Sequence, residues 1–296
     1  MEGELWKELY RIVCEESNKR PRHKHVQFSD ARILEVFFWA AIHDRPTRWA
    51  CRPENWPPET RWQDLPCDST MSVRLRTLPV RLLMDAILNR LHACSDPALV
   101  RLLDSKPLPV GCYSKDHDAH WGWAATAKAR GYKLFCGWGQ SVTPDAWTLG
   151  PMNVSDQEAG IKLVPQLTGA IYVLGDAGFD SNRLHATCDH CRCQLVSPRR
   201  KPQTNLGHGR HEPQRLRSIE MLEWPALLGT APSPFARDLY AMRGQIERDY
   251  GNLCGFGGGL QPLPSWVRTP HRVALWVAAK LVINGLRRCK NAGLAA

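Results

Sequence analysis

Three acidic residues, Asp104, Asp176 and Glu247, have the type and spacing that a catalytic metal site requires. Asp104 ends the apolar run 98–104, and Asp176 lies two residues after the apolar run 171–174. Intervals of 72 residues (104 to 176) and 71 residues (176 to 247) separate them, so only folding can bring them together. Mg²⁺ prefers oxygen ligands and is commonly held by a few carboxylates, water and substrate phosphate. We therefore expect these acids to be catalytic and to bind Mg²⁺, with Mn²⁺ as a substitute.

Each of these acids also has a structural interpretation. Aspartate is common in turns and helix caps, and Glu247 stands four residues after Arg243, a spacing at which helical side chains pair. For any single acid the structural interpretation is the simpler one. The placement of the three acids on different elements favours a metal site for the set, because three such acids can flank a pair of metal ions. Two metal ions about 3.5–4 Å apart stabilise both the attacking and the leaving oxygen in phosphoryl transfer.

The segment around Glu247 adds two candidate DNA-binding residues. Tyr240, Arg243 and Glu247 stand at positions i, i+3 and i+7, so they share one face of a helix. Arginine beside a metal site is suited to bind phosphate through two parallel hydrogen bonds. Tyr240 can donate a hydrogen bond to a DNA backbone, and a buried structural tyrosine is the equal alternative.

The elements that must position these residues alternate after residue 98. The capping pair Ser155 and Glu158 marks the start of one helix, and the glycines of 255–259 mark the end of another. Pro107 and Pro109 are expected to stop the first strand. The periodicity predicts strands over 98–104, 132–138, 146–149, 171–174 and 193–197, and helices over 155–167, from about 181, and over 235–253. Three sequential strands followed by alternating helices and strands predict a ribonuclease H-like mixed α/β sheet flanked by helices.

Residues 1–95 are predicted to form an all-α N-terminal region. We expect a helix capped by Asp30, a loop over 45–66 rich in proline and tryptophan, a short helix opened by Asp68, and a helix over 80–91 after Pro79. The segment from Arg45 to Arg76 has two equal interpretations: a helix-turn-helix that reads a major groove, or a helical subdomain used for packing or dimerisation. The remaining chain, 96–296, is assigned to one catalytic domain.

The charge of the chain indicates a polyanionic partner. The formal net charge is +10 and the sequence pI is about 9.2, and no acidic residue follows Asp249. A basic insertion covers about 198–230. Such an excess favours nucleic acid or an acidic membrane. The basic residues expected to bind DNA are Arg74, Arg76, Arg199, Arg200 and Lys201.

Several features argue for a protein of the cytoplasm. The longest apolar stretch near the end, 273–283, is too short to span a membrane and contains Lys280. The acidic, amphipathic N-terminus does not resemble a signal peptide. The eleven cysteines suit reduced thiols better than a disulfide framework. We therefore expect no membrane partner.

Three other groups of residues have alternative interpretations. Cys188, Cys191 and Cys193 form half of a zinc-site pattern, with a reduced cysteine-rich helix as the favoured alternative. The segment 116–120 is dense in aspartate and histidine, and we expect it to be a surface loop. The tryptophans Trp121, Trp123, Trp138 and Trp147 are expected to pack in the core or in a hairpin rather than to stack on nucleobases.

Four segments resemble one known family. The spacing Tyr240-x2-Arg243-x3-Glu247 resembles the tyrosine–arginine–glutamate signature of DDE transposases encoded by bacterial insertion sequences. The segments 102–109 (LLDSKPLP) and 173–181 (VLGDAGFDS) resemble those that carry the two catalytic aspartates of that family, and 130–134 (RGYKL) resembles its second core strand. The signature continues with a lysine seven residues after the glutamate, where this chain has Cys254.

The resemblance implies a function and partners. It implies cleavage of double-stranded DNA at element ends by water, followed by attack of the freed 3′ hydroxyl on target DNA. It also implies a homodimer on paired ends, in a bacterial cytoplasm and associated with the nucleoid when bound. Two alternatives stay open from the residues alone: a metal-dependent nuclease on the same fold, and a decayed or domesticated copy that binds DNA without catalysis. The cysteine at position 254 favours the last, and the three intact acids oppose it.

Overall fold

The computed structural model describes most of the chain and divides it into two compact units. The helical unit comprises 1–94, 253–260 and 266–296, and the sheet unit comprises 95–252 and 261–265. The described residues are 2–21, 26–60, 64–95, 98–111, 113–124, 126–202, 204, 206, 209–223, 231, 233–255, 259–260 and 262–294.

The helical unit is built around one central helix, α2 (Asp30–Ile42), which is buried along almost its whole length. The hydroxyl group of Ser29 caps this helix by accepting from the Arg32 N–H (3.1 Å), so the predicted cap, Asp30, is instead its first residue. The other elements are α1 (Glu2–Asn18), α3 (Thr47–Ala50), η1 (Pro53–Asn55), η2 (Pro58–Thr60), α4 (Asp68–Arg74), α5 (Leu78–His92) and α12 (Pro270–Asn291). The predicted all-α N-terminal region is therefore confirmed.

The C-terminal helix α12 packs with these N-terminal helices. It contacts α5, α2 and α1. Its buried Lys280 donates hydrogen bonds to Asp44 Oδ1 (2.6 Å) and to the Ala41 carbonyl (2.8 Å). The apolar periodicity of α12 shows that this helix needs a packing partner, but it does not show which element supplies the partner. The predicted catalytic domain therefore included α12 together with residues 96–269. The domain boundary near residue 95 stays a prediction. None of the helices in the described part of the chain has the length and apolar character needed to cross a membrane.

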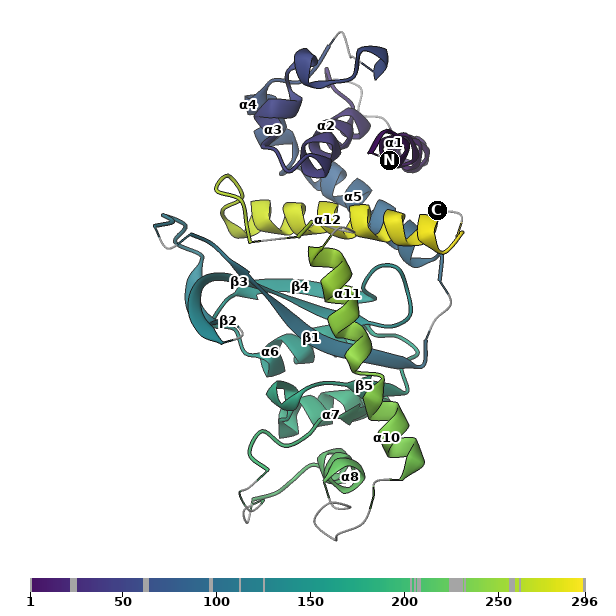
Figure 1. Ribbon diagram of the computed structural model, residues 1–296, viewed down its shortest axis with the longest axis vertical. Helices are drawn as coiled ribbons and strands as arrows, with labels where there is room; N and C mark the ends of the chain where they lie inside the picture. Colours follow the sequence, from purple (N-terminus) through teal and green to yellow (C-terminus); the bar gives the residue numbers. More distant parts are fainter. Residues whose placement is uncertain are drawn as a thin grey trace. The chain divides into compact units, whose positions relative to one another are not determined.

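The sheet unit contains a six-stranded mixed sheet (Figure 1). Its strands are β1 (Val100–Pro109), β2 (His120–Ala124), β3 (Ala127–Trp138), β4 (Ala146–Pro151), β5 (Tyr172–Leu174) and β6 (Gln194–Val196). Strand β1 pairs antiparallel with β3 and parallel with β5, and β6 extends the parallel part. Strands β2 and β4 pair with successive parts of β3. The antiparallel part followed by parallel strands confirms the predicted α/β class, and it is compatible with a ribonuclease H-like fold.

Strand β1 is longer than predicted, so Asp104 lies in the middle of the strand and not at its end. The register places Pro107 and Pro109 opposite Lys133 and Gly131. The carbonyl of Pro109 accepts from the Leu263 N–H (3.1 Å), which shows that its polar backbone faces away from β3. Strand β5 pairs only with residues 100–102 of β1. At Pro107 and Pro109 no neighbouring strand therefore requires a backbone N–H on the side of β1 that faces away from β3.

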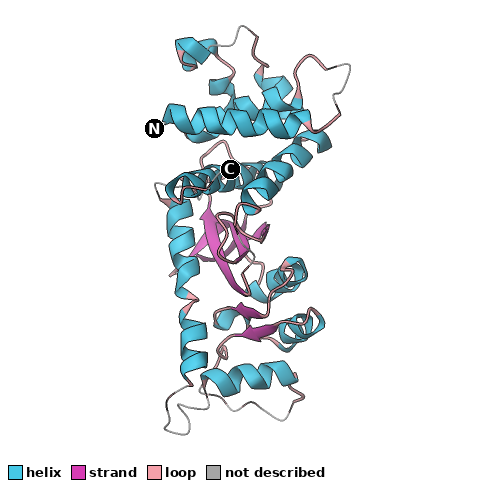
Figure 2. Ribbon diagram, turned by 90° about the vertical axis from the view of Figure 1, so that its right-hand side faces the viewer, coloured by secondary structure: helices cyan, strands magenta, loops and turns pink. Residues whose placement is uncertain are grey.

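Helices cover both faces of the sheet (Figure 2). On one face, α6 (Asp156–Leu163) and α7 (Asn182–His190) form a core with Leu103 and Phe135. On the other face, Tyr250 of α11 (Gly244–Cys254) meets Trp138 with ring centroids 6.1 Å apart. The remaining elements are η3 (Val164–Gln166), η4 (Ala177–Phe179), α8 (Pro213–Leu222) and α10 (Pro234–Ala241).

The single helix predicted over 235–253 is two helices, α10 and α11. Between them the N–H groups of Arg243 and Ile246 donate to carbonyls three residues earlier, Tyr240 (3.0 Å) and Arg243 (3.2 Å). Such bonds form a tighter turn than an α-helix. Gly244 stands at this junction, and glycine is a weak helix former. Tyr240 and Glu247 were predicted to share one face of a single helix. Because of this turn, the two residues belong to different helices.

Candidate active site

Asp104 lies on the sheet face that α11 covers. It pairs with Cys136 in the register, and Tyr250 donates a hydrogen bond to the Asp104 carbonyl (2.9 Å). Burial raises the pKa of Asp104 to about 6, although the Ser105 N–H, which donates to its Oδ1 (2.8 Å), lowers it. Asp176 raises this pKa further, Arg243 lowers it, and Asp156 raises it. Asp104 therefore lies in an acidic cluster that disfavours its own charge.

Asp176 lies in a turn that several side chains hold in place. Its Oδ1 accepts from the Gly178 N–H (2.8 Å) as the cap of η4. Its carbonyl accepts from the Ser197 hydroxyl (2.6 Å), and the carbonyl of Gly175 accepts from Tyr240 (3.4 Å). Ser197 is itself fixed by Ser218, whose hydroxyl accepts from its N–H and donates to its carbonyl, both at 2.9 Å. Strand β6 and α8 thus hold the turn that carries Asp176.

A third aspartate, Asp156 at the start of α6, belongs to the same cluster and was missed by the sequence analysis. Asp156 Oδ2 and Asp176 Oδ1 each lie 2.9 Å from the place where a Cβ on Gly178 would stand. Any larger residue at position 178 would collide with both carboxylates. In the sequence Asp156 is only an acid in the first turn of a capped helix, which is common and needs no ligand.

Glu247 stands on α11 one turn before Tyr250, the residue that joins this helix to Asp104. Its side chain is 67% exposed, and its Oε1 lies 3.8 Å from Arg243 Nη1. Among the described residues, no three His, Cys, Asp or Glu side chains converge closely enough to hold a metal ion. The structure places Asp156 beside Asp176, and both acids act on Asp104 by raising its pKa, while Glu247 stays exposed on α11. Its role as a third ligand stays a prediction.

The cluster nevertheless fits a divalent cation. Asp104 is half-buried and its pKa is raised, so its charge is poorly compensated. Asp156 Oδ1 is buried and, within the described part of the chain, has no hydrogen-bond partner; the nearest cation, Lys133 Nζ, lies 3.7 Å away. Carboxylate oxygens are the ligands that Mg²⁺ prefers. A cation held by Asp104 and Asp176, with Asp156 beside them, would supply the missing positive charge.

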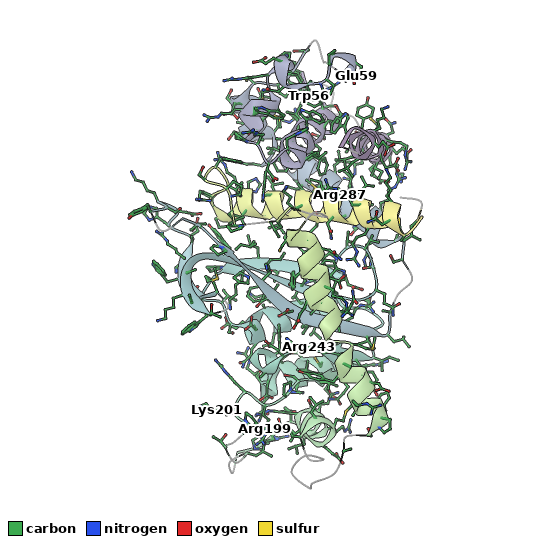
Figure 3. The ribbon with its side chains drawn as sticks, in the orientation of Figure 1. Trp56, Glu59, Arg199, Lys201, Arg243 and Arg287 are labelled. Atoms are coloured by element: carbon green, nitrogen blue, oxygen red, sulfur yellow. The ribbon has the colours of Figure 1, made fainter. Side chains whose placement is uncertain are left out.

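Arg243 occupies the turn between α10 and α11 (Figure 3). It lowers the pKa of Asp104, and it also opposes the increase in the pKa of Tyr240 that burial causes. Its Nε is buried and has no hydrogen-bond partner among the described residues. The side chain is 24% exposed, so the terminal nitrogens of the guanidinium group can reach a phosphate oxygen.

The predicted DNA-binding residues of the basic insertion differ in their contacts (Figure 3). Arg199 is bound to the Glu223 carboxylate and donates to the carbonyls of Thr204 (2.9 Å) and Pro202 (2.8 Å). Arg200 and Lys201 are exposed. Arg199 thus holds the insertion to α8, and the two residues after it face solvent.

The predicted basic residues of the N-terminal region divide in the same way. Arg74 donates to Asp30 Oδ1 (2.6 Å) and to the Phe28 carbonyl (2.8 Å), so it connects α4 with the start of α2. Arg76 is exposed. Because Arg74 points to α2, these contacts favour the packing interpretation of α4 over the groove-reading one.

The other dense groups of potential ligands have structural roles. Cys188 and Cys193 are buried in the core, where the Cys193 thiol lies 3.4 Å from the Cys188 carbonyl, and they form no ligand set with Cys191. Asp116 is buried and accepts from Tyr132 (2.8 Å), so it closes the connection before β2.

The mixed sheet flanked by helices is compatible with a ribonuclease H-like α/β domain. Comparison with known proteins gives its family. The family of the transposase DDE domain matches residues 95–279, more than half of the chain, and the chain belongs to this family. No curated protein and no solved structure matches it.

Proposed function

We propose that this transposase cleaves DNA at the ends of an insertion sequence and joins the freed ends to target DNA, with Asp104, Asp176 and Glu247 as the metal-binding acids. The observation that carries the proposal is the cluster of Asp104, Asp176 and Asp156, in which burial and neighbouring carboxylates raise the pKa of Asp104 to about 6. A buried group of like charges costs free energy unless a cation neutralises it. Mg²⁺, or Mn²⁺ in its place, is the cofactor that suits these ligands.

The residues of the chain divide the work of phosphoryl transfer. Bound Mg²⁺ would activate the attacking oxygen and stabilise the leaving oxygen. Asp104 and Asp176 are oriented in advance by the N–H groups of Ser105 and Gly178. The exposed Glu247 completes the ligand set by a change of rotamer when DNA and metal bind. Arg243 binds the phosphate through its free donors.

DNA is the partner that the charge supports. The net charge is +10, and the segment after Asp249 contains basic residues but no acidic ones. Arg200, Lys201 and Arg76 are exposed and bind backbone phosphates in this proposal, together with Tyr240 at the Asp176 turn. Two ends must be cut and joined together, so we expect a homodimer in the active complex, in the cytoplasm of a bacterium and on its nucleoid.

The test compares cleavage and joining of a labelled duplex that carries the inverted repeats flanking the gene, in Mg²⁺. The variant Glu247→Gln keeps the shape of the side chain and removes its charge. Glu220→Gln, an exposed glutamate of α8, is the matched control. We expect the wild type and Glu220→Gln to cleave and join, and Glu247→Gln to bind the duplex without cleaving it.

Other outcomes distinguish the alternatives. Equal cleavage by wild type and Glu247→Gln would show that Glu247 is a structural residue of α11. Cleavage without joining would identify a nuclease. Binding without cleavage by the wild type would identify a copy that has lost catalysis. Cys254, which replaces the signature lysine, would then be the first residue to test as the cause.

A further inference from the structure

Two tryptophans of the β2–β3 hairpin are exposed to solvent. Trp121 is 60% and Trp123 62% exposed, contrary to the expected packing in a core or hairpin. Single exposed apolar side chains are common, but adjacent ones that form a continuous patch mark a contact site. The family assignment gives these two residues no role.

The hairpin holds both indole rings on the same side. Trp121 and Trp123 alternate with Gly122 along β2, so they project from one face. On the opposite face the buried Met152 lies so close that a Cβ on Gly122 would stand 2.3 Å from its carbonyl oxygen. Glycine at position 122 therefore lets β2 pack against Met152 by one face and present both rings on the other.

Basic residues lie across the hairpin from the two rings. From Ala119 to Pro144 the chain has no acidic residue, and Lys128 and Arg130 share the face of the tryptophans. Lys128 is the cross-strand partner of Trp123, and its Nζ lies 5.9 Å from the centre of that ring. Arg130 is the partner of Trp121 and donates to the carbonyls of Ala119 and Ser114, both at 2.7 Å, so it stabilises the hairpin. The exposed Lys128 is the cation available to a ligand.

The same face of the sheet carries Asp104. Trp123 pairs with Lys128, and eight residues further along β3 Cys136 pairs with Asp104, so these side chains leave the sheet on one side. Eight residues of extended strand span at most about 27 Å, which is less than one turn of duplex DNA at about 34 Å. A strand cut at Asp104 can therefore reach the hairpin. In Figure 1, β2 and the beginning of β3 lie to one side of α11, at the edge of the sheet.

We propose that Trp121 and Trp123, with Lys128, form a stacking site for unpaired DNA bases within one helical turn of the cleavage site. The Cα atoms of Trp121 and Trp123 are about 6.7 Å apart along the strand. This distance equals two base-stacking steps of roughly 3.4 Å each. Aromatic rings bind the faces of bases, which paired DNA hides, while a lysine neutralises the adjacent phosphate. This inference rests on the proposed function in taking DNA as the ligand.

The test measures binding of a short oligothymidine and of a duplex of the same length, both in EDTA so that no cleavage occurs. Trp121→Ala/Trp123→Ala should bind the oligothymidine at least about tenfold more weakly and the duplex nearly as well as the wild type. Trp121→Phe/Trp123→Phe keeps aromatic rings and should retain most of the affinity. Phe235→Ala, which removes an exposed ring from α10, is the matched control and should leave both affinities unchanged.

A second measurement works on the unmodified protein. Oligothymidine containing 5-bromodeoxyuridine should cross-link under ultraviolet light to the peptide that contains Trp121 and Trp123. Cross-links that map elsewhere, or unchanged oligothymidine affinity of a folded Trp121→Ala/Trp123→Ala variant, would overturn the proposal. It would also be overturned if that variant changed only the oligomeric state, which would identify a contact with a second copy of the chain. Failure to bind either DNA would instead contradict the proposed function itself.

Discussion

Asp104 illustrates at the scale of a single residue how a partly buried acid lowers stability. Burial and the nearby Asp176 and Asp156 raise its pKa to about 6, so its ionisation opposes folding at neutral pH. The penalty is absent below the ordinary aspartate pKa of 3.8, grows as the pH rises to about 6, and is fully present above it. A residue retained despite such a cost is a candidate for function.

The first prediction uses that cost. Asp104→Asn should raise the free energy of unfolding of the metal-free protein by about 1–3 kcal/mol at pH 7.5, since one pKa unit corresponds to about 1.4 kcal/mol. The gain should disappear near pH 4, where the wild-type carboxyl is protonated in the folded state. Denaturant unfolding of both proteins at the two pH values measures it. A variant less stable than the wild type at pH 7.5 would show that the Asp104 carboxylate is well compensated.

The second prediction concerns Asp156, the acid that only the structure revealed. Asp156→Asn should lower Mg²⁺-dependent cleavage by about 10–100-fold, as is typical of residues that support metal ligands. The effect should shrink at high Mg²⁺ if the loss lies in metal affinity. Activity equal to the wild type at low Mg²⁺ would show that Asp156 merely begins α6.

At the scale of elements, α8 and η4 are held together by one buried ion pair. Asp180 accepts from Arg215 through both oxygens (2.7 and 2.8 Å), and His185 lies 3.6 Å away. Burial disfavours the charge of Asp180, yet the hydrogen bonds from Arg215 and His185 outweigh burial and lower its pKa well below the usual range. The pair connects the basic insertion to the end of the Asp176 turn.

The third prediction tests this connection. Asp180→Asn should lower the free energy of unfolding by about 3–5 kcal/mol at neutral pH, because it leaves Arg215 without its partner. A carboxylate whose pKa is lowered in the folded state stabilises the protein at pH values above its unfolded-state pKa. This stabilisation is lost as the pH falls through the folded-state pKa. The difference between variant and wild type should therefore shrink as the pH falls below about 4. A constant difference down to pH 2 would contradict the assigned charge of Asp180.

Elements were predictable where the local pattern decides them. The strands β1, β3, β4, β5 and β6 and the cap at Ser155 were predicted from apolar runs and turn residues. Strand β2 was missed, because Gly122 between two tryptophans does not resemble a strand. The break at Arg243 was missed because the apolar period continues through it. The predicted strand ended too early at Asp104, because prolines stop a strand only where a neighbouring strand needs their N–H.

The site was predictable only in part. Asp104 and Asp176 follow strands in the sequence, and in the structure Asp176 is near enough to raise the pKa of Asp104. Asp156 could not be predicted, because its closeness to Asp176 depends on how α6 packs beside Gly178. For the same reason the sequence could not distinguish Arg74 and Arg199, which hold carboxylates of the protein, from exposed neighbours such as Arg76 and Lys201.

At the scale of the whole molecule, the net charge of +10 should appear in the salt dependence of DNA binding. Each phosphate contact releases counterions, so the logarithm of the binding constant falls with the logarithm of salt concentration by about 0.9 per contact. Arg200→Ala/Lys201→Ala should reduce that slope by about two. The control Arg237→Ala removes an exposed arginine already paired with Asp238 (2.9 Å) and should change it little. An unchanged slope in the double variant would remove these residues from the DNA-binding surface.

Binding of Mn²⁺ to the wild type and to Asp104→Asn, measured by electron paramagnetic resonance, tests directly whether Asp104 is a metal ligand. Asp238→Asn, an exposed aspartate of α10, serves as the matched control. We expect the wild type and Asp238→Asn to bind Mn²⁺ alike and Asp104→Asn to lose the site. Wild-type affinity should weaken as the pH falls through 6, where Asp104 takes up a proton. Equal binding by all three proteins would contradict the assignment of Asp104 as a metal ligand, and with it the carboxylate mechanism.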